Sequence, residues 1–389
     1  MFFCGALQAI AAMAWWLLDL TGRYAEWHAP IAWTVPPMWA HAWLLIYGLF
    51  PFFMFGFLMT AGPSWLGAPA PSRRVFVPSA LVMALGLALF YVGVASARAL
   101  AAAGALLHLA GWLWGIGALV RLAAQHWGAQ ARYALLIFAF VAVGVLGDAV
   151  FAFSIASGNY AYTTYALHGG VWFFLLPVFL GVTTRMVPFF SSRVLGPEAD
   201  YKPAWARPLL VAGALAHGAL ELGGAPHLLW VVDFPLAFAL IVLVRRWGLM
   251  KSLRVRLLAV LHLSLLMLAI AFALYGVLSV GVAVGALTRI GAAPLHLLVT
   301  GYFAATLIGM VSRVSLGHSG RPLEADVLTW ACYLGVLVAA LLRVAAEFMP
   351  GSGAGSLLML AAGFAWLAAF AIWALRYAPM YLKPRVDGR

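Results

Sequence analysis

Histidine is the residue type in this sequence best placed to bind a metal or a cofactor within apolar segments. His41, His168, His227 and His296 each lie within three residues of the start of such a segment, and His217 lies in the outer half of another. Neutral imidazoles that converge from several helices ligate haem iron or copper in sites shielded from water. The pattern is typical of one haem between two helices, and it allows a copper ion nearby. The alternative is that each histidine lies at a membrane interface and hydrogen-bonds a backbone carbonyl.

Three acidic residues, Asp148, Glu221 and Asp233, interrupt the apolar segments at a similar depth. Ionisable groups inside a membrane are costly, so they are functional candidates. His217 and Glu221 are four residues apart and therefore share one face of a helix. This pair fits a metal ligand with a carboxylate that orients it, a proton relay, or a buried hydrogen-bonded pair. Asp148 and Asp233 are candidates for the same proton-handling or orienting roles.

Two arginines, Arg98 and Arg289, are the scarce cations predicted at the level of the histidines. Two roles fit them. They can hold haem propionates through charge-assisted hydrogen bonds, or they can stabilise the ends of helices.

The amino-acid composition indicates the class of protein in which these residues lie. Hydrophobic residues make up 66% of the 389 residues and charged residues 9%, whereas a soluble domain averages roughly 45–50% and about 25%. A water-soluble enzyme, a nucleic-acid binder and a disordered chain are therefore excluded. The only cysteines, Cys4 and Cys332, provide neither a disulfide framework nor a CxxC pair. The sequence predicts an all-α polytopic membrane protein.

Twelve segments are long and apolar enough to be spanning helices of about 20 residues. We place them at residues 2–20, 39–62, 75–95, 97–120, 133–156, 166–187, 207–224, 226–244, 257–279, 294–316, 326–347 and 353–375. If all twelve cross the membrane, 19 of the 23 Lys and Arg residues lie on the side of the C-terminal tail. Cytoplasmic loops carry an excess of Lys and Arg, so both termini are predicted to be cytoplasmic.

The sixth and tenth segments match each other. His168 and His296 open them, and Arg185 and Arg313 each follow 17 residues later. Such a separation spans about 26 Å along a helix. The second segment fits more loosely, with Trp43 at the histidine position and His41 two residues earlier. The second and sixth segments are about 125 residues apart, and the sixth and tenth are 128 residues apart. These spacings predict three four-helix units, at about 1–126, 127–250 and 251–389. Together they form a single transmembrane domain of residues 1–389.

Four stretches of the chain resemble the NnrS family of bacterial membrane proteins linked to nitric oxide stress. The most specific of their motifs are SRVSLGHSGRPL and YLKPRVDGR, and the stretches are residues 38–67, 168–195, 295–323 and 376–389. The resemblance implies a twelve-helix protein of the bacterial inner membrane that contains haem and copper and helps bacteria to withstand nitric oxide. Members of the family often have a His-Ala-His pair where this chain has His41-Ala42-Trp43, which leaves His41 as the candidate ligand on this helix.

The chain is also loosely similar to the catalytic subunit of haem–copper oxidases and nitric oxide reductases. That resemblance implies a low-spin haem between histidines of helices 2 and 10, here His41 and His296, and metal ligands on helices 6 and 7, here His168 and His217. The His-x-His of helix 10 and the His-His pair of helix 7 are missing from the sequence. A second haem and a three-histidine copper centre therefore lack their usual ligands.

These observations predict one b-type haem with His41 and His296 as axial ligands, near which Arg98 and Arg289 lie, and a protein that binds or converts nitric oxide. His168 and His217 would shape a second site for copper or a small ligand. Electrons would come from quinol or another redox protein, because the sequence contains no soluble redox domain. Two alternatives remain: a secondary transporter of a small ion or metabolite, since transporters commonly contain internal repeats, and a protein that senses or sequesters nitric oxide without turnover.

Overall fold

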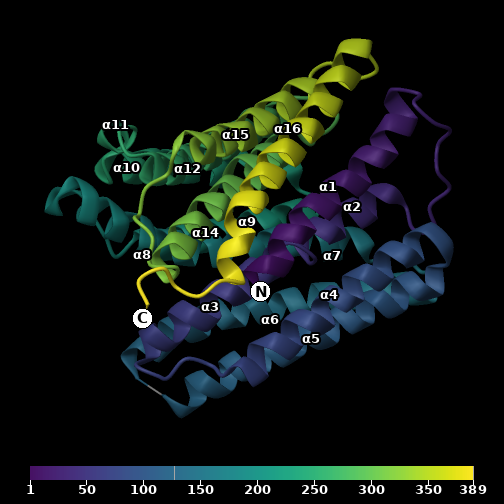
Figure 1. Cartoon of the computed structure of the whole chain (residues 1–389). Coiled ribbons are helices and arrows are strands. Elements are labelled where there is room, and N and C mark those ends of the chain that lie inside the picture. Colours follow the sequence, from purple (N-terminus) through teal and green to yellow (C-terminus); the bar gives the residue numbers. More distant parts are fainter. Residues whose placement is uncertain (127, 389) are drawn as a thin grey trace. The chain divides into compact units, whose positions relative to one another are not determined.

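The computed structural model describes residues 1–126 and 128–388, and within these residues every regular element is helical. The chain divides into two compact units (Figure 1). Unit 1 contains Met1–Asp19 and Ala29–Val178, and unit 2 contains Leu20–His28 and Phe179–Arg389. The predicted three four-helix units stay a prediction, and their first boundary falls on residue 127, outside the described residues.

Unit 1 consists of helices whose ends carry typical boundary residues. Gly67 and Gly158, for example, adopt positive φ angles of 65° and 71° and end two of the helices. The helices are α1 (Phe2–Tyr24, whose last residues belong to unit 2), α2 (Pro37–Ile46), α3 (Phe50–Leu66), α4 (Arg73–Ser96), α5 (Arg98–Gln125), α6 (Ala129–Ser157), α7 (Thr163–Gly169) and the π-helix η1 (Gly170–Leu175).

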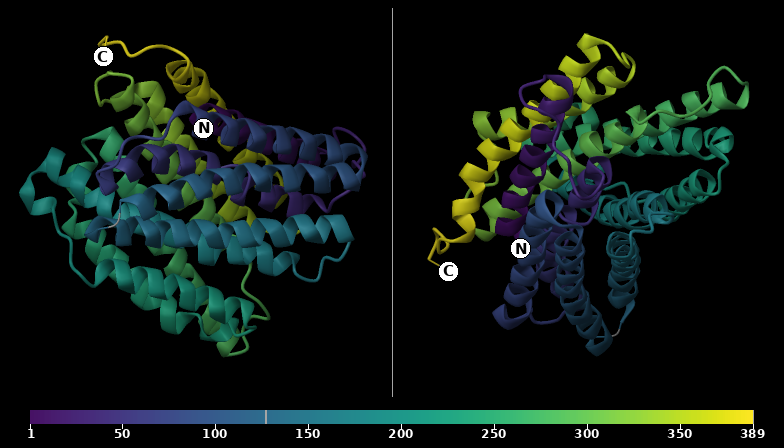
Figure 2. Two further views of the ribbon diagram at one scale, coloured as in Figure 1. Left: turned by 90° about the horizontal axis from the view of Figure 1, so that it is seen from below. Right: turned by 90° about the vertical axis from the view of Figure 1, so that its right-hand side faces the viewer.

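Helices α4, α5 and α6 lie side by side in unit 1 (Figure 2). Only Ala97, in an extended conformation, separates α4 from α5, which confirms the predicted break between Ser96 and Arg98. Gly86 and Gly93 of α4 face the backbone of α5 so closely that a Cβ atom at either position would collide with it. Small residues allow such close approach between membrane helices. The α4–α5 hairpin is therefore held by backbone-to-backbone packing.

Unit 2 contains the remaining helices, apart from the first residues of α8, which belong to unit 1, and two of them, α15 and α16, begin at side-chain caps. The Asp326 carboxylate accepts a hydrogen bond from the Thr329 N–H at 2.9 Å, and Ser352 accepts one from the Gly355 N–H at 3.0 Å. The elements are α8 (Leu176–Leu195), η2 (Pro197–Ala199), α9 (Ala206–Leu222), η3 (Pro226–Leu228), α10 (Trp230–Arg246), α11 (Leu249–Ser252), α12 (Arg256–Ala283), α13 (Ala293–His296), the π-helix η4 (Leu297–Ala304), α14 (Ala305–His318), α15 (Val327–Glu347), α16 (Gly353–Tyr377) and η5 (Ala378–Tyr381).

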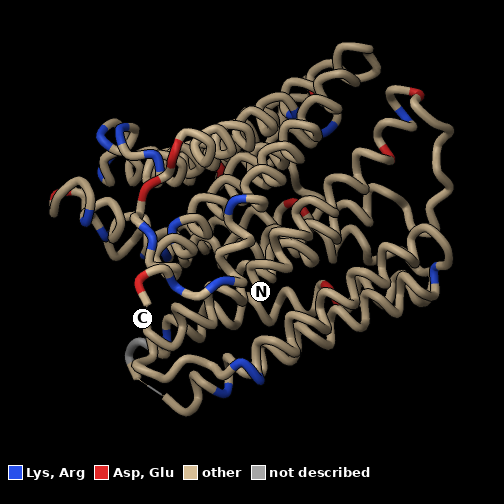
Figure 3. The backbone as a smooth tube through the Cα atoms, viewed as in Figure 1, with Lys and Arg blue, Asp and Glu red and all other residues tan. Residues whose placement is uncertain are grey.

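Each of the twelve predicted segments is helical, but not all of them meet the criteria for a membrane span. In the described part of the chain, ten helices are long and apolar enough to cross a membrane, which indicates a membrane protein. Figure 3 shows Lys and Arg mainly near helix ends and in the connections. The other two predicted segments correspond to α9 and α10, which have only 17 residues each. Twelve crossings therefore remain a prediction.

The loop that contains the SRVSLGHSGRPL motif binds the C-terminal tail. The Val386 N–H donates to the Ser319 carbonyl at 3.1 Å, and Arg385 donates to the His318 carbonyl at 3.2 Å. The two most specific motifs of the sequence are thus in contact with each other. This contact gives the loop a structural role, since it fixes the chain end to the last turn of α14.

Candidate functional site

The three helices that begin with a candidate histidine share a local irregularity. The π-helix η1 begins two residues after His168, and the π-helix η4 begins directly after His296. After His41, the helix is interrupted between Ile46 and Phe50. Short π-helical segments are rare and occur frequently at functional sites. The matching irregularity supports the predicted similarity of the sixth and tenth segments and draws attention to the histidines beside it.

His296 is oriented by its own helix. Its Nδ1–H donates to the Ala292 carbonyl at 2.8 Å, which fixes the neutral tautomer with a lone pair on Nε2. Within the described residues, Nε2 has no hydrogen-bond partner. The Glu347 carboxylate accepts the Ala292 N–H at 3.1 Å and pairs with Arg343 at 2.9 Å. An imidazole that donates one N–H to a carbonyl and offers the other nitrogen is the usual state of a metal-ligating histidine.

His41 and His168 are both half-buried in unit 1. The ring of His41, on α2, stacks on Trp16 of α1 with 4.2 Å between centroids and an interplanar angle of 16°. His168 is the penultimate residue of α7. The predicted pairings of His41 with His296 and of His168 with His217 join residues of different units and stay predictions.

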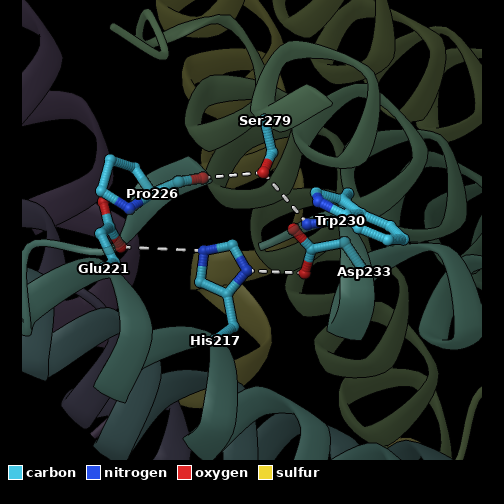
Figure 4. Close-up of polar contacts among 6 residues, drawn as sticks. All are labelled: His217, Glu221, Pro226, Trp230, Asp233 and Ser279. Carbon is cyan, nitrogen blue, oxygen red and sulfur yellow. Dashed lines mark hydrogen bonds and ion pairs between the residues drawn. The ribbon is translucent and has the colours of Figure 1, made fainter. Parts of the chain in front are cut away.

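His217 lies at the centre of a buried polar cluster in unit 2 (Figure 4). Its Nδ1 is 2.7 Å from Asp233 Oδ1, and its Nε2 is 3.8 Å from Glu221 Oε2. His217 and Asp233 are completely buried, and Glu221 is partly exposed. The ring of Tyr275, on α12, meets the imidazole edge-on with 4.6 Å between centroids. The strong hydrogen bond of His217 is therefore to Asp233 of the next helix, while Glu221 faces the opposite nitrogen.

One hydroxyl group of α12 hydrogen-bonds the turn of the α9–α10 hairpin that carries this cluster. Ser279 Oγ donates to the Pro226 carbonyl at 2.7 Å and accepts the Trp230 N–H at 3.1 Å (Figure 4). Trp230 begins α10, so its N–H has no partner within that helix. The serine thereby fixes the start of the helix that carries Asp233.

The cluster can hold a proton or orient a ligand. Asp233 holds the Nδ1–H of His217, and the second carboxylate lies beside Nε2, so the imidazole is placed between two negative groups. A carboxylate that accepts one imidazole N–H orients the ring, so that its other nitrogen faces a metal or a proton acceptor. In the parts of the chain that the structure describes, no three His, Cys, Asp or Glu side chains are arranged to hold a metal ion together.

A second buried carboxylate–histidine pair lies in unit 1. Asp148, on α6, accepts hydrogen bonds from Trp43 Nε1 at 2.7 Å and His108 Nδ1 at 3.1 Å. Both members of the pair are completely buried, and Phe90 and Phe151 pack on the Trp43 indole. The Nε2 atom of His108 has no hydrogen-bond partner among the described residues. Each unit thus contains an imidazole whose Nδ1 is held by an aspartate of the following helix.

The two predicted arginines lie in different surroundings. Arg98 begins α5 and lies against Gly158, the residue that caps the C-terminal end of α6. A cation is favourable at the negative end of the helix dipole. Arg289 is exposed in the connection between α12 and α13. The position of Arg98 fits the helix-end role, and the propionate role stays a prediction for both residues.

Sequence reasoning missed several residues of these clusters, among them His108, Ser279 and Ala292. His108 has the signal of an ionisable residue in the middle of an apolar segment, but it does not share the depth of the other histidines. Ala292 takes part only through its backbone, which leaves no trace in the sequence. The sequence did identify His217, Glu221 and Asp233 individually, although it paired His217 with Glu221 alone.

The comparison with known families agrees with the motifs. The family described as NnrS protein matches residues 1–385 of the 389 residues. No curated protein matches the chain. Since the family match covers both units and all the clusters described above, the chain belongs to the NnrS family.

Proposed function

We propose that this chain is a haem protein of the bacterial inner membrane that binds or converts nitric oxide and protects the cell against nitrosative stress. Membership of the NnrS family suggests a role in the nitric oxide response. In the proposed orientation both termini are cytoplasmic, and the histidine-bearing starts of the sixth and tenth segments face the periplasm. The bilayer is the surrounding partner, and nitric oxide is the small-molecule ligand.

The observation that carries this proposal is the state of His296. Its Nδ1–H is used by the Ala292 carbonyl, and its Nε2 has no hydrogen-bond partner in the described parts of the chain. An imidazole in this state fits haem iron, which takes a neutral nitrogen donor. The adjoining π-helix also supports a functional role, because regular α-helix would serve packing alone. We propose that His41 would be the second histidine to hold the haem.

The other candidate residues take supporting roles in this proposal. Arg98 and Arg289 are the proposed partners of the haem propionates, and His168 and His217 are the proposed ligands of a second site for copper or a small molecule. Asp233 orients the His217 imidazole, and Glu221 and Asp148 are further groups that can take or release a proton. Bound haem supplies an iron centre that takes nitric oxide as a ligand. Electrons for any conversion come from quinol or another redox protein.

The test is an absorption spectrum of the purified full-length chain, with haem quantified after extraction. We expect a Soret band in the unmodified protein. His41→Ala and His296→Ala should each lose bound haem or change its spin state, since each removes a histidine that would hold the haem iron. His227→Ala is the matched control, because His227 lies at a similar predicted depth but is exposed in η3. It should leave the spectrum unchanged.

Three outcomes decide between the alternatives. Absence of a Soret band, or a band that survives both alanine substitutions, would contradict the haem proposal. Stoichiometric binding of nitric oxide without consumption in the presence of an electron donor identifies a sensor or sequestering protein. Solute uptake by cofactor-free proteoliposomes identifies a carrier.

A further inference from the structure

A cavity of about 550 Å³ lies in unit 2, where the end of α8 meets the connection between α10 and α12. Apolar side chains line part of it, namely Leu195, Leu249 and Met250. Three basic residues, Arg245, Arg246 and Lys251, also line it. Figure 3 shows this group of cations around α11, beyond the uncharged part of α10. The cavity therefore combines an apolar surface with concentrated positive charge.

The cavity is bounded by backbone that local contacts hold in place. Trp247, which is 1% exposed, donates from Nε1 to the Tyr201 carbonyl at 2.7 Å and joins the two connections to each other. Gly248 adopts a φ of 90°, which favours glycine and turns the chain directly after α10. The buried Ser252 closes the next turn by donating to the Leu249 carbonyl at 2.6 Å. The wall of the cavity is thus preorganised.

The positive charge of the cavity is only partly neutralised. Glu198 is the acidic residue of the lining, and its carboxylate pairs with Lys251 at 3.0 Å. Both side chains are mostly exposed, so this ion pair is weak. Arg246 lies over the Tyr201 ring, 5.5 Å from its centroid, and Arg245 forms no ion pair within the described residues. Three cations and one anion leave an excess of two positive charges.

The position of the cavity favours a lipid headgroup over a soluble anion as its ligand. The cavity lies at the end of α8, which belongs to a helical segment long and apolar enough to cross a membrane, so we expect it where the apolar helices meet the polar surface of a bilayer. Met250 is 75% exposed and Leu253 43% exposed next to these cations. Exposed apolar side chains beside arginine and lysine are a combination that contacts acyl chains and phosphates together. A soluble anion would use the charges but not the apolar surface.

We propose that this cavity binds an anionic glycerophospholipid, with Arg245 and Arg246 on the phosphate and Met250 against an acyl chain. The arginines have planar, multiple N–H donors that match phosphate oxygens. This site does not depend on the haem proposal, because it involves none of the candidate haem ligands. A bound lipid would contact both the end of α8 and the connection between α10 and α12.

The test is binding of dioleoylphosphatidylglycerol to the purified full-length chain in neutral detergent, measured by native mass spectrometry. We expect dioleoylphosphatidylcholine to bind far more weakly. The double variant Arg245→Gln/Arg246→Gln should weaken phosphatidylglycerol binding about tenfold or more, since each basic residue near the surface contributes to anionic lipid affinity. Arg254→Gln is the matched control, because Arg254 is an exposed cation of the same connection that does not line the cavity.

Several results would overturn the proposal. Equal binding of the two lipids excludes recognition of charge, and equal losses in the double variant and Arg254→Gln exclude a defined site. Competition by millimolar inorganic phosphate that matches competition by phosphatidylglycerol identifies a soluble-anion site instead. Arg245→Gln alone provides a second variant, because this side chain is exposed and outside any described ion pair, so the fold does not depend on it.

Discussion

Trp43 occupies the position where the family resemblance implies a second histidine, and in the structure it donates a hydrogen bond to a buried carboxyl group. Its indole N–H is one of two donors to the buried Asp148 carboxylate, and His108 is the other. A buried charge without such donors costs far more than the net gain of the bonds themselves. Trp43 and His108 therefore do the same thing for Asp148, although one is an indole and the other an imidazole: each donates one hydrogen bond to its carboxyl group.

Trp43→Phe should reduce the free energy of unfolding by about 1–3 kcal/mol more than a matched control, because Asp148 Oδ1 would then be buried without a donor. The control is Trp112→Phe, which makes the same change of volume at a completely buried indole whose N–H has no hydrogen-bond partner in the described residues. The measurement is reversible unfolding in mixed detergent micelles. Equal losses in the two variants would show that the hydrogen bond contributes nothing.

At the scale of elements, the helices that carry the clusters are positioned by two different devices. Glycines bring the backbones of α4 and α5 together, whereas the turn of the α9–α10 hairpin is hydrogen-bonded by the Ser279 hydroxyl of α12, which also packs against α10. Apolar burial provides little driving force between helices in lipid, so close packing and hydrogen bonds must select the partner helix. The first contact fixes α5, which carries His108, against α4, and the second fixes the start of α10, which carries Asp233.

Gly93→Ala should destabilise the protein by about 1–3 kcal/mol, because the new methyl group meets the backbone of Ala101, which has no rotamer to change. Gly117→Ala is the control within the same hairpin. Gly117 is exposed on α5 with open space around it, so alanine should be neutral or stabilise the helix by about 1 kcal/mol at most. Thermal unfolding in detergent measures both, and a stable Gly93→Ala protein would refute the close packing of α4 and α5.

At the scale of the whole molecule, the Lys and Arg residues are unevenly divided between the two predicted sides of the membrane. Nineteen of the 23 basic residues would lie on one side if twelve helices cross. The structure places α9 and α10 just below the length of the ten apolar spans, at 17 residues each. A 17-residue helix is about 26 Å long, which a bilayer of about 30 Å accommodates by thinning or by snorkelling of flanking arginines. We therefore expect both to cross.

Cysteine labelling tests this expectation in a background with Cys4→Ser and Cys332→Ser, which removes both native thiols. Leu228→Cys, between α9 and α10, should react with an impermeant maleimide in intact cells. Leu253→Cys, after α11, should react only after permeabilisation. Both side chains are exposed, so access to reagent is not limited by burial.

Ser352→Cys and Ser72→Cys supply the controls for the two sides in the proposed orientation, since they lie in connections between spans of sufficient length. Reaction of Leu228→Cys and Leu253→Cys from the same side would show that α9 and α10 do not both cross, and the twelve-span prediction would then fail.

The sequence alone determined the helical segments, and all twelve predicted ranges contain helix in the structure. The reason is physical: in lipid the backbone must satisfy its own hydrogen bonds, so hydropathy and breaks at Gly, Pro and charges suffice to locate the helices. It also determined which polar residues deserve attention, because rare ionisable groups stand out in an apolar segment. His217, Glu221 and Asp233 were found in this way.

Only the tertiary structure decided which of these groups meet. His108 and Asp148 are 40 residues apart, and His217 and Asp233 are 16 residues apart across a hairpin, so neither contact follows from helical spacing. The π-helices beside His168 and His296 likewise depend on packing, because apolar residues alone do not distinguish them from α-helix. Spacing along one helix predicts the His217–Glu221 pair, but the shorter bond to Asp233 requires the register between two helices, which packing sets.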